Sequence, residues 1–153
     1  MKPFKSSLLE RTVNQYLATV PDPNHFFEIL AELFGIQPNS LKSNTVYYWK
    51  AGYVFGTAAE KTHSQQRGLD RLSLFLYGLR VPEDHKVIAE LREIPTFIYP
   101  PADEEASKKV RQTYEREPTK DALINRIYSL EEKHAPAVHT FLDDLLSQHN
   151  QAS

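Results

Sequence analysis

Prolines and the spacing of the apolar residues between them most constrain the fold of this chain. Ten prolines are spread over 153 residues. A proline lacks the backbone N–H and clashes with the preceding helical turn, so it is found at helix starts or beyond helix ends. Between the prolines, apolar residues recur three or four positions apart, which is typical of amphipathic helices. The clearest of these stripes comprises Leu69, Leu72, Phe75, Leu76 and Leu79.

Capping residues predict where several of the helices begin and end. Asp22 is expected to cap a helix that has Pro23 at its first position and Gly35 at its end. Pro82 is expected to open a later helix, and Thr119 to cap another. The first and the last helix of the chain show the same apolar spacing as these three. On all five helices we predict that the following side chains face inward: Leu9, Val13, Val20, Phe26, Phe27, Leu30, Val87, Ile88, Leu91, Leu123, Ile127, Leu130, Val138, Phe141, Leu142 and Leu145.

The segment 45–57 fits two kinds of secondary structure. Its aromatic and β-branched residues are typical of a strand or hairpin. Val46, Trp49 and Tyr53 nevertheless recur at helical spacing, and strong helix formers follow them. We therefore predict a helix that weakens or stops at Gly52.

Two segments complete the predicted fold. Residues 96–99 lie among three prolines, so a short extended segment is expected there, with Phe97 and Tyr99 held in the core. Residues 103–117 predict a mostly solvated helix, because only Val110 and Tyr114 are available for burial. The sequence therefore predicts an all-α fold: a single orthogonal helical bundle of seven or eight short-to-medium helices, in one domain over residues 1–153.

Composition excludes several classes of function. The chain has no cysteine, which rules out disulfides and thiolate chemistry. Its formal charge of −2 is unlike that of a strongly basic nucleic-acid coat. None of the five glycines forms a phosphate-binding loop motif, so no nucleotide cofactor is expected. No apolar stretch is long enough to span a bilayer and no export signal is visible, so we expect a cytoplasmic protein without a membrane partner.

Residues 29–52 resemble the helix-turn-helix of repressor-type transcription regulators. Ala31 stands at the close contact between the helices, Gly35 lies in the turn, and Val46 and Trp49 match the inward anchors of the second helix. The intervening QPNSLKSN makes the turn longer than in that family. The resemblance implies that the second helix presents polar side chains to the edges of DNA bases.

The outward side chains of this segment are the candidate contacts for DNA or for a protein partner. They are Lys42, Asn44, Thr45, Tyr47, Tyr48 and Lys50. Tyr47, Tyr48 and Tyr53 would also suit a protein-binding patch, since tyrosine is common at the energetic centres of interfaces. We therefore predict a non-catalytic regulatory or binding protein that acts through contacts with a protein partner or with DNA.

Two Glu-x-x-His pairs offer an alternative function. Glu60 precedes His63 by three residues, and Glu131 precedes His134 by three. On a helix, this spacing places a carboxylate and an imidazole on one face. Two such pairs resemble the ligands of ferritin-like di-iron carboxylate proteins, which implies bound iron or manganese and an oxidase activity. The same spacing also occurs in ordinary surface pairs on helices.

Overall fold

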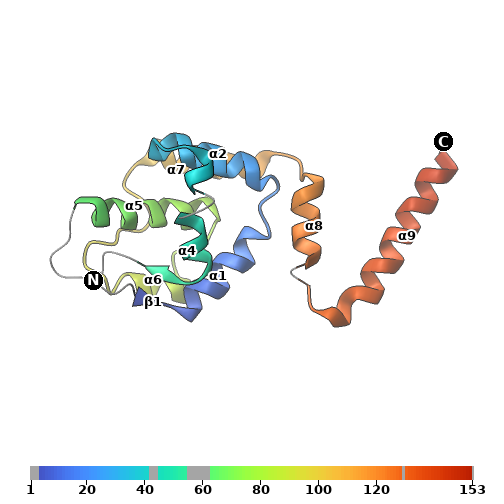
Figure 1. The fold of residues 1–153 in the computed structure, drawn as a ribbon, viewed down its shortest axis with the longest axis horizontal. Helices are drawn as coiled ribbons and strands as arrows, with labels where there is room; N and C mark the ends of the chain where they lie inside the picture. The colour runs from blue at the N-terminus through green and yellow to red at the C-terminus, as the bar shows by residue number, and fades with distance from the viewer. Residues whose placement is uncertain (1–3, 42–44, 55–62, 129, 153) are drawn as a thin grey trace.

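The computed structural model describes residues 4–41, 45–54, 63–128 and 130–152, and it confirms the predicted all-α class. Helices α1, α2 and α4–α7 form the body of the protein, and α8 and α9 extend from one side of it (Figure 1). The α-helices are α1 (Ser7–Leu17), α2 (Pro23–Phe34), α3 (Pro38–Ser40), α4 (Val46–Lys50), α5 (His63–Gly78), α6 (Lys86–Leu91), α7 (Glu104–Gln112), α8 (Lys120–Tyr128) and α9 (Ala135–Ala152). The remaining elements are β1 (Phe4–Lys5), β2 (Tyr53–Val54), η2 (Thr113–Glu115) and η3 (Glu132–His134).

The predicted ends of α2 are confirmed. The Asp22 carboxylate accepts a hydrogen bond from the backbone N–H of His25 at 3.2 Å, and Pro23 is the first helical residue. Gly35 follows the helix in the left-handed conformation, with φ at 68°. Phe26, Phe27 and Leu30 are buried as predicted. The local sequence alone therefore specifies this helix.

Helix α5 carries the central stripe of the core. All five residues of its predicted stripe, from Leu69 to Leu79, are at most 1% exposed. Helix α7 packs along α5 and also against α2. Gly78 permits this close approach, because a Cβ atom at Gly78 would lie 2.6 Å from Cε2 of Phe26 and 3.0 Å from Cβ of Val110.

Residues 103–117 are mostly exposed, as predicted, but burial there is not limited to Val110 and Tyr114. Ala106, Ser107 and Val110 are buried on α7, and Thr113 is buried just after it. The two hydroxyl groups donate to backbone carbonyls of their own segment: Ser107 to Asp103 at 2.8 Å and Thr113 to Val110 at 2.6 Å. These bonds satisfy the buried hydroxyl groups, so polar residues occupy a helix face that apolar periodicity does not reveal.

The predicted helix of segment 45–57 is present as α4 and stops before Gly52, as predicted, and residues 55–57 lie outside the described residues. Helix α4 ends at Lys50, and Gly52 then turns the chain with φ at 87°. Tyr53 and Val54 form β2, which pairs antiparallel with Lys5 and Phe4 of β1. The Ser6 N–H also donates to the Gly52 carbonyl oxygen at 2.8 Å. This pairing joins segments far apart in the sequence.

Helix α6 begins later than predicted, at Lys86 instead of Pro82. The Nδ1 atom of His85 accepts a hydrogen bond from the Val87 N–H at 3.0 Å, so His85 caps the helix. Residues 96–99 adopt turns and irregular backbone and do not form a strand. Phe97 and Tyr99 are nevertheless buried, as predicted.

Helices α8 and α9 differ most from the prediction. The predicted cap of α8 is present, since the Thr119 hydroxyl accepts from the Ala122 N–H at 3.1 Å. The Thr119 N–H also donates to the Pro21 carbonyl oxygen at 2.9 Å, which fixes the start of α8 to the body. The stripes that were expected to face the core are partly or largely exposed: Leu123, Ile127, Leu130, Val138, Phe141, Leu142 and Leu145. The prediction that these residues are inward-facing is therefore wrong for the isolated chain.

Substitutions at two glycines of α5 test whether Gly78 is needed for the close packing at the C-terminal end of this helix. We expect Gly78→Ala to lower the free energy of unfolding by about 1–3 kcal/mol, because its methyl group would overlap the buried Phe26 ring. Gly68→Ala is the matched control, since no atom lies within 4 Å of the added Cβ. That substitution should stabilise the protein by about 0.5–1 kcal/mol through helix propensity. Urea denaturation followed by circular dichroism measures both, and equal effects of the two substitutions would contradict this account.

Candidate functional site

The predicted DNA-contacting or partner-contacting segment is described in part. Lys42 and Asn44 lie outside the described residues. Val46 and Trp49 are buried, which confirms their predicted inward orientation. Tyr47 and Tyr48 point outward and are 64% and 42% exposed.

The geometry around α4 differs from a regular helix-turn-helix. Helix α3 lies between α2 and α4, and α4 itself has five residues. Five residues make about one and a half helical turns. Thr45 precedes the helix and Lys50 is exposed at its end, where the Lys50 carbonyl oxygen accepts a hydrogen bond from Asn14 Nδ2 at 3.0 Å. DNA binding by this segment stays a prediction.

Three tyrosines gather beside α4 and form what we call the tyrosine patch. The ring centroids of Tyr47 and Tyr48 are 5.8 Å apart, and those of Tyr48 and Tyr53 are 6.3 Å apart, both in edge-to-face arrangements. The Lys5 ammonium lies 5.6 Å from the centroid of the Tyr53 ring. The patch therefore combines aromatic surface with a positive charge, which suits protein contacts.

Only one of the two Glu-x-x-His pairs, Glu131 and His134, lies wholly among the residues whose side chains the structure describes. Glu60 lies outside them, and His63 is the first residue of α5, where only its backbone is described. Glu131 and His134 do not share an α-helix face, because Glu131 has extended backbone and His134 ends the short η3. The Glu131 carboxylate lies 3.0 Å from the Lys133 ammonium. Within the described ranges, no group of three His, Asp or Glu side chains could hold a metal ion.

Most of the exposed large hydrophobic side chains lie in the C-terminal part of the chain, on α8 and α9 and between them. Twelve large hydrophobic side chains are exposed among the described residues, and nine of them lie between Leu123 and Leu146. We call this surface the C-terminal apolar face. Its members are Leu123, Ile124, Ile127, Tyr128, Leu130, Phe141, Leu142, Leu145 and Leu146. Sequence reasoning found most of these residues but assigned them to the core.

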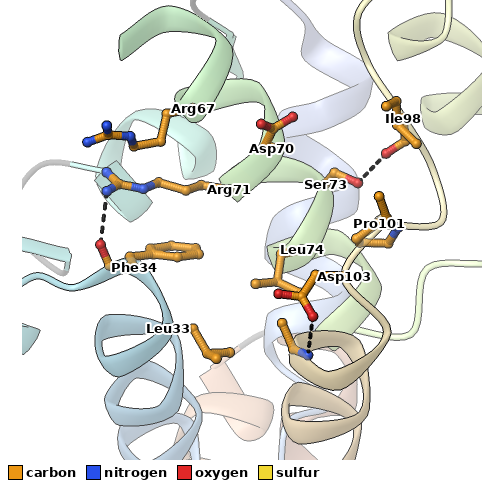
Figure 2. A pocket seen from close by; sticks show the side chains of 12 residues that line it. Leu33, Phe34, Arg67, Asp70, Arg71, Ser73, Leu74, Ile98, Pro101 and Asp103 are labelled. Atoms are coloured by element: carbon orange, nitrogen blue, oxygen red, sulfur yellow. Dashed lines mark hydrogen bonds between the residues drawn. The ribbon is translucent and has the colours of Figure 1, made fainter. Parts of the chain in front are cut away.

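A pocket of about 510 Å³ lies between the end of α2, the middle of α5 and the segment 98–106. We call it the arginine pocket, because Arg67 and Arg71 extend side by side from α5 along one of its edges (Figure 2). Arg71 Nη2 donates to the Phe34 carbonyl oxygen at 3.1 Å, and its guanidinium lies 5.1 Å from the Phe34 ring centroid. Partial burial lowers the pKa of Arg71, and the charge of Arg67 lowers it further.

Sequence reasoning missed the arginine pocket. The spacing of Arg67 and Arg71 places them on one face of α5, and this is the only local signal. The other walls come from the end of α2 and from the segment 98–106, which the sequence does not place beside α5.

Among the residues that the structure describes, no helix combines the length and the apolar character needed to cross a bilayer. Comparisons with protein-family models, curated proteins and solved structures gave no match to this chain.

Two substitutions on α4 distinguish its inward and outward faces. Trp49→Ala should lower the free energy of unfolding by about 3–5 kcal/mol, because it leaves a cavity where a buried indole contacts Phe75. Tyr47→Ala should change it by less than about 0.5 kcal/mol, because Tyr47 is largely exposed. Circular dichroism in urea suits both variants. Tryptophan fluorescence does not, because Trp49 is the only tryptophan and Trp49→Ala removes it. A large loss for Tyr47→Ala would contradict the described orientation of α4.

Proposed function

We propose that this protein is a non-catalytic binding protein that recognises a protein partner through the C-terminal apolar face. The observation that supports the proposal is the concentration of nine exposed large apolar side chains between Leu123 and Leu146, eight of them on α8 and α9. Exposed large apolar side chains that are concentrated in one region of a protein mark sites of interaction. A cytoplasmic location and a regulatory role form part of the same proposal.

The pattern of α9 supports recognition by helix packing. Val138, Phe141, Leu142 and Leu145 lie three or four residues apart, so they form one stripe along the helix. Thr140, Asp143 and Ser147 lie on the opposite side of the helix. A helix with one apolar stripe suits a partner that offers an apolar groove or another amphipathic helix.

The body of the protein does not cover this stripe. The core cluster and the side chains packed against it run from Leu8 to Tyr114 and include no residue of α9. Helix α8 is held at its start by the bonds of Thr119 to Pro21, and the ion pair between Arg116 and Asp22 at 3.5 Å lies nearby. The body therefore positions α8, while α9 extends away from it (Figure 1).

Paired substitutions on α9 test the proposal. The double variant Leu142→Glu/Leu145→Glu places two charges on the apolar stripe, and Thr140→Glu/Ser147→Glu places the same two charges on the opposite side. After in-cell crosslinking and nuclease treatment, quantitative mass spectrometry should find a partner retained by the wild type and by the control. The stripe variant should lose at least about 90% of it, because burying unpaired charge in an interface is costly.

Self-association is measured on the same three proteins by sedimentation velocity. A dimer that the stripe variant alone loses would identify the partner as a second copy. Capture of the same proteins by all three forms, or capture that nuclease abolishes, would contradict the proposal. Thermal unfolding of the body should be equal in the three forms, since the core cluster includes no residue of α9.

A further inference from the structure

The arginine pocket has the size and lining of a small-molecule site. Its volume of about 510 Å³ falls within the range of roughly 300–1,000 Å³ that is usual for ligand pockets. Most of its wall is apolar, with Leu33, Phe34, Leu74, Ile98 and Ala106 among the lining residues. Such a wall suits the hydrocarbon part of a ligand.

Arg67 and Arg71 supply positive charge at one edge of this apolar wall. Their side chains run in the same direction from α5 (Figure 2). A guanidinium carries five N–H donors, and the bond to Phe34 uses one donor of Arg71. The fixed planar geometry of the guanidinium matches a carboxylate oxygen pair. An anion placed here would also relieve the repulsion between the two arginines, which already lowers the pKa of Arg71.

The acidic residues of the lining favour a single negative charge on the ligand. Asp70 and Asp103 also line the pocket, so its formal charge is balanced without a ligand. The Asp103 carboxylate accepts the Ala106 N–H at 3.1 Å and caps α7, across the pocket from the arginines (Figure 2). A dianion would be repelled more strongly by these carboxylates than a monoanion.

From this arrangement we propose that the arginine pocket binds a small monocarboxylate with an apolar body, the carboxylate lying against Arg67 and Arg71 and the hydrocarbon against Leu33, Leu74 and Ala106. This inference is independent of the proposed partner binding. The pocket lies beside the middle of α5, whereas α8 and α9 extend from the other side of the body (Figure 1).

An NMR titration with octanoate tests the proposal on the full chain. Octanoate should shift the backbone amide resonances of Leu33, Leu74 and Ala106 in a saturable manner. Arg67→Glu should weaken octanoate binding by about tenfold or more, because a charge-assisted contact becomes a repulsion. Arg11→Glu is the matched control: Arg11 is exposed on α1 and does not line the pocket, so this variant should bind like the wild type.

Two further ligands separate the contributions of charge and hydrocarbon. Acetate carries the carboxylate alone and octan-1-ol carries the chain alone, so each should bind more weakly than octanoate. Equal binding of acetate would mean non-specific anion binding, and equal binding of octan-1-ol would mean that the arginines play no part; either result overturns the proposal. Shifts confined to α8 and α9 would overturn it as well, and would show octanoate on the C-terminal apolar face instead.

Arg71→Lys provides a second test of the guanidinium geometry. Lysine keeps the positive charge but lacks the planar fork, so octanoate binding should weaken. Thermal unfolding of each variant confirms that the body is folded before the titration is interpreted. Unchanged octanoate binding in both Arg67→Glu and Arg71→Lys would exclude the pocket as the site.

Discussion

The aromatic contact around Phe75 is the interaction on which the body depends. The ring centroid of Phe75 lies 4.8 Å from that of Trp49 and 5.8 Å from that of Phe26. Phe75 belongs to α5, Trp49 to α4 and Phe26 to α2, so a single buried side chain connects three helices. Gly78, one turn later on α5, leaves room for both the Phe26 ring and Val110 of α7. The body is therefore organised by a few large side chains and one missing Cβ.

The parts of the fold that could be predicted are those specified by nearby residues. Asp22, Pro23 and Gly35 act within a single helix, and the stripe of α5 needs only its own periodicity. The pairing of Phe4 with Val54 was missed because neither two-residue strand carries a pattern of its own. The start of α6 was missed for a similar reason: a histidine nitrogen serves as the cap there, in place of the proline that was expected to open the helix.

The candidate sites show a different limit of sequence reasoning. The stripe of α9 has the same periodicity as the stripe of α5, although α7 covers α5 and no residue of α9 joins the core. Apolar periodicity predicts that one face of a helix is buried. It does not indicate whether the same chain or a partner chain buries that face. The arginine pocket was not predictable because its walls come from Phe34, Arg71 and Ile98, which only the folded chain brings together.

The exposed stripe also determines how α9 gains its stability. An isolated helix is marginal in water below about 12–15 residues, and α9 has 18, so its length alone gives a weakly stable helix. The ion pair between His139 and Asp143 at 3.3 Å adds only about a few tenths of a kcal/mol when the imidazole is protonated. Helix α5, of similar length, is stabilised by packing against α7 and against the aromatic side chains of α2 and α4. A partner that covers Phe141, Leu142 and Leu145 would give α9 the same kind of packing, so partner binding and the stability of α9 are coupled.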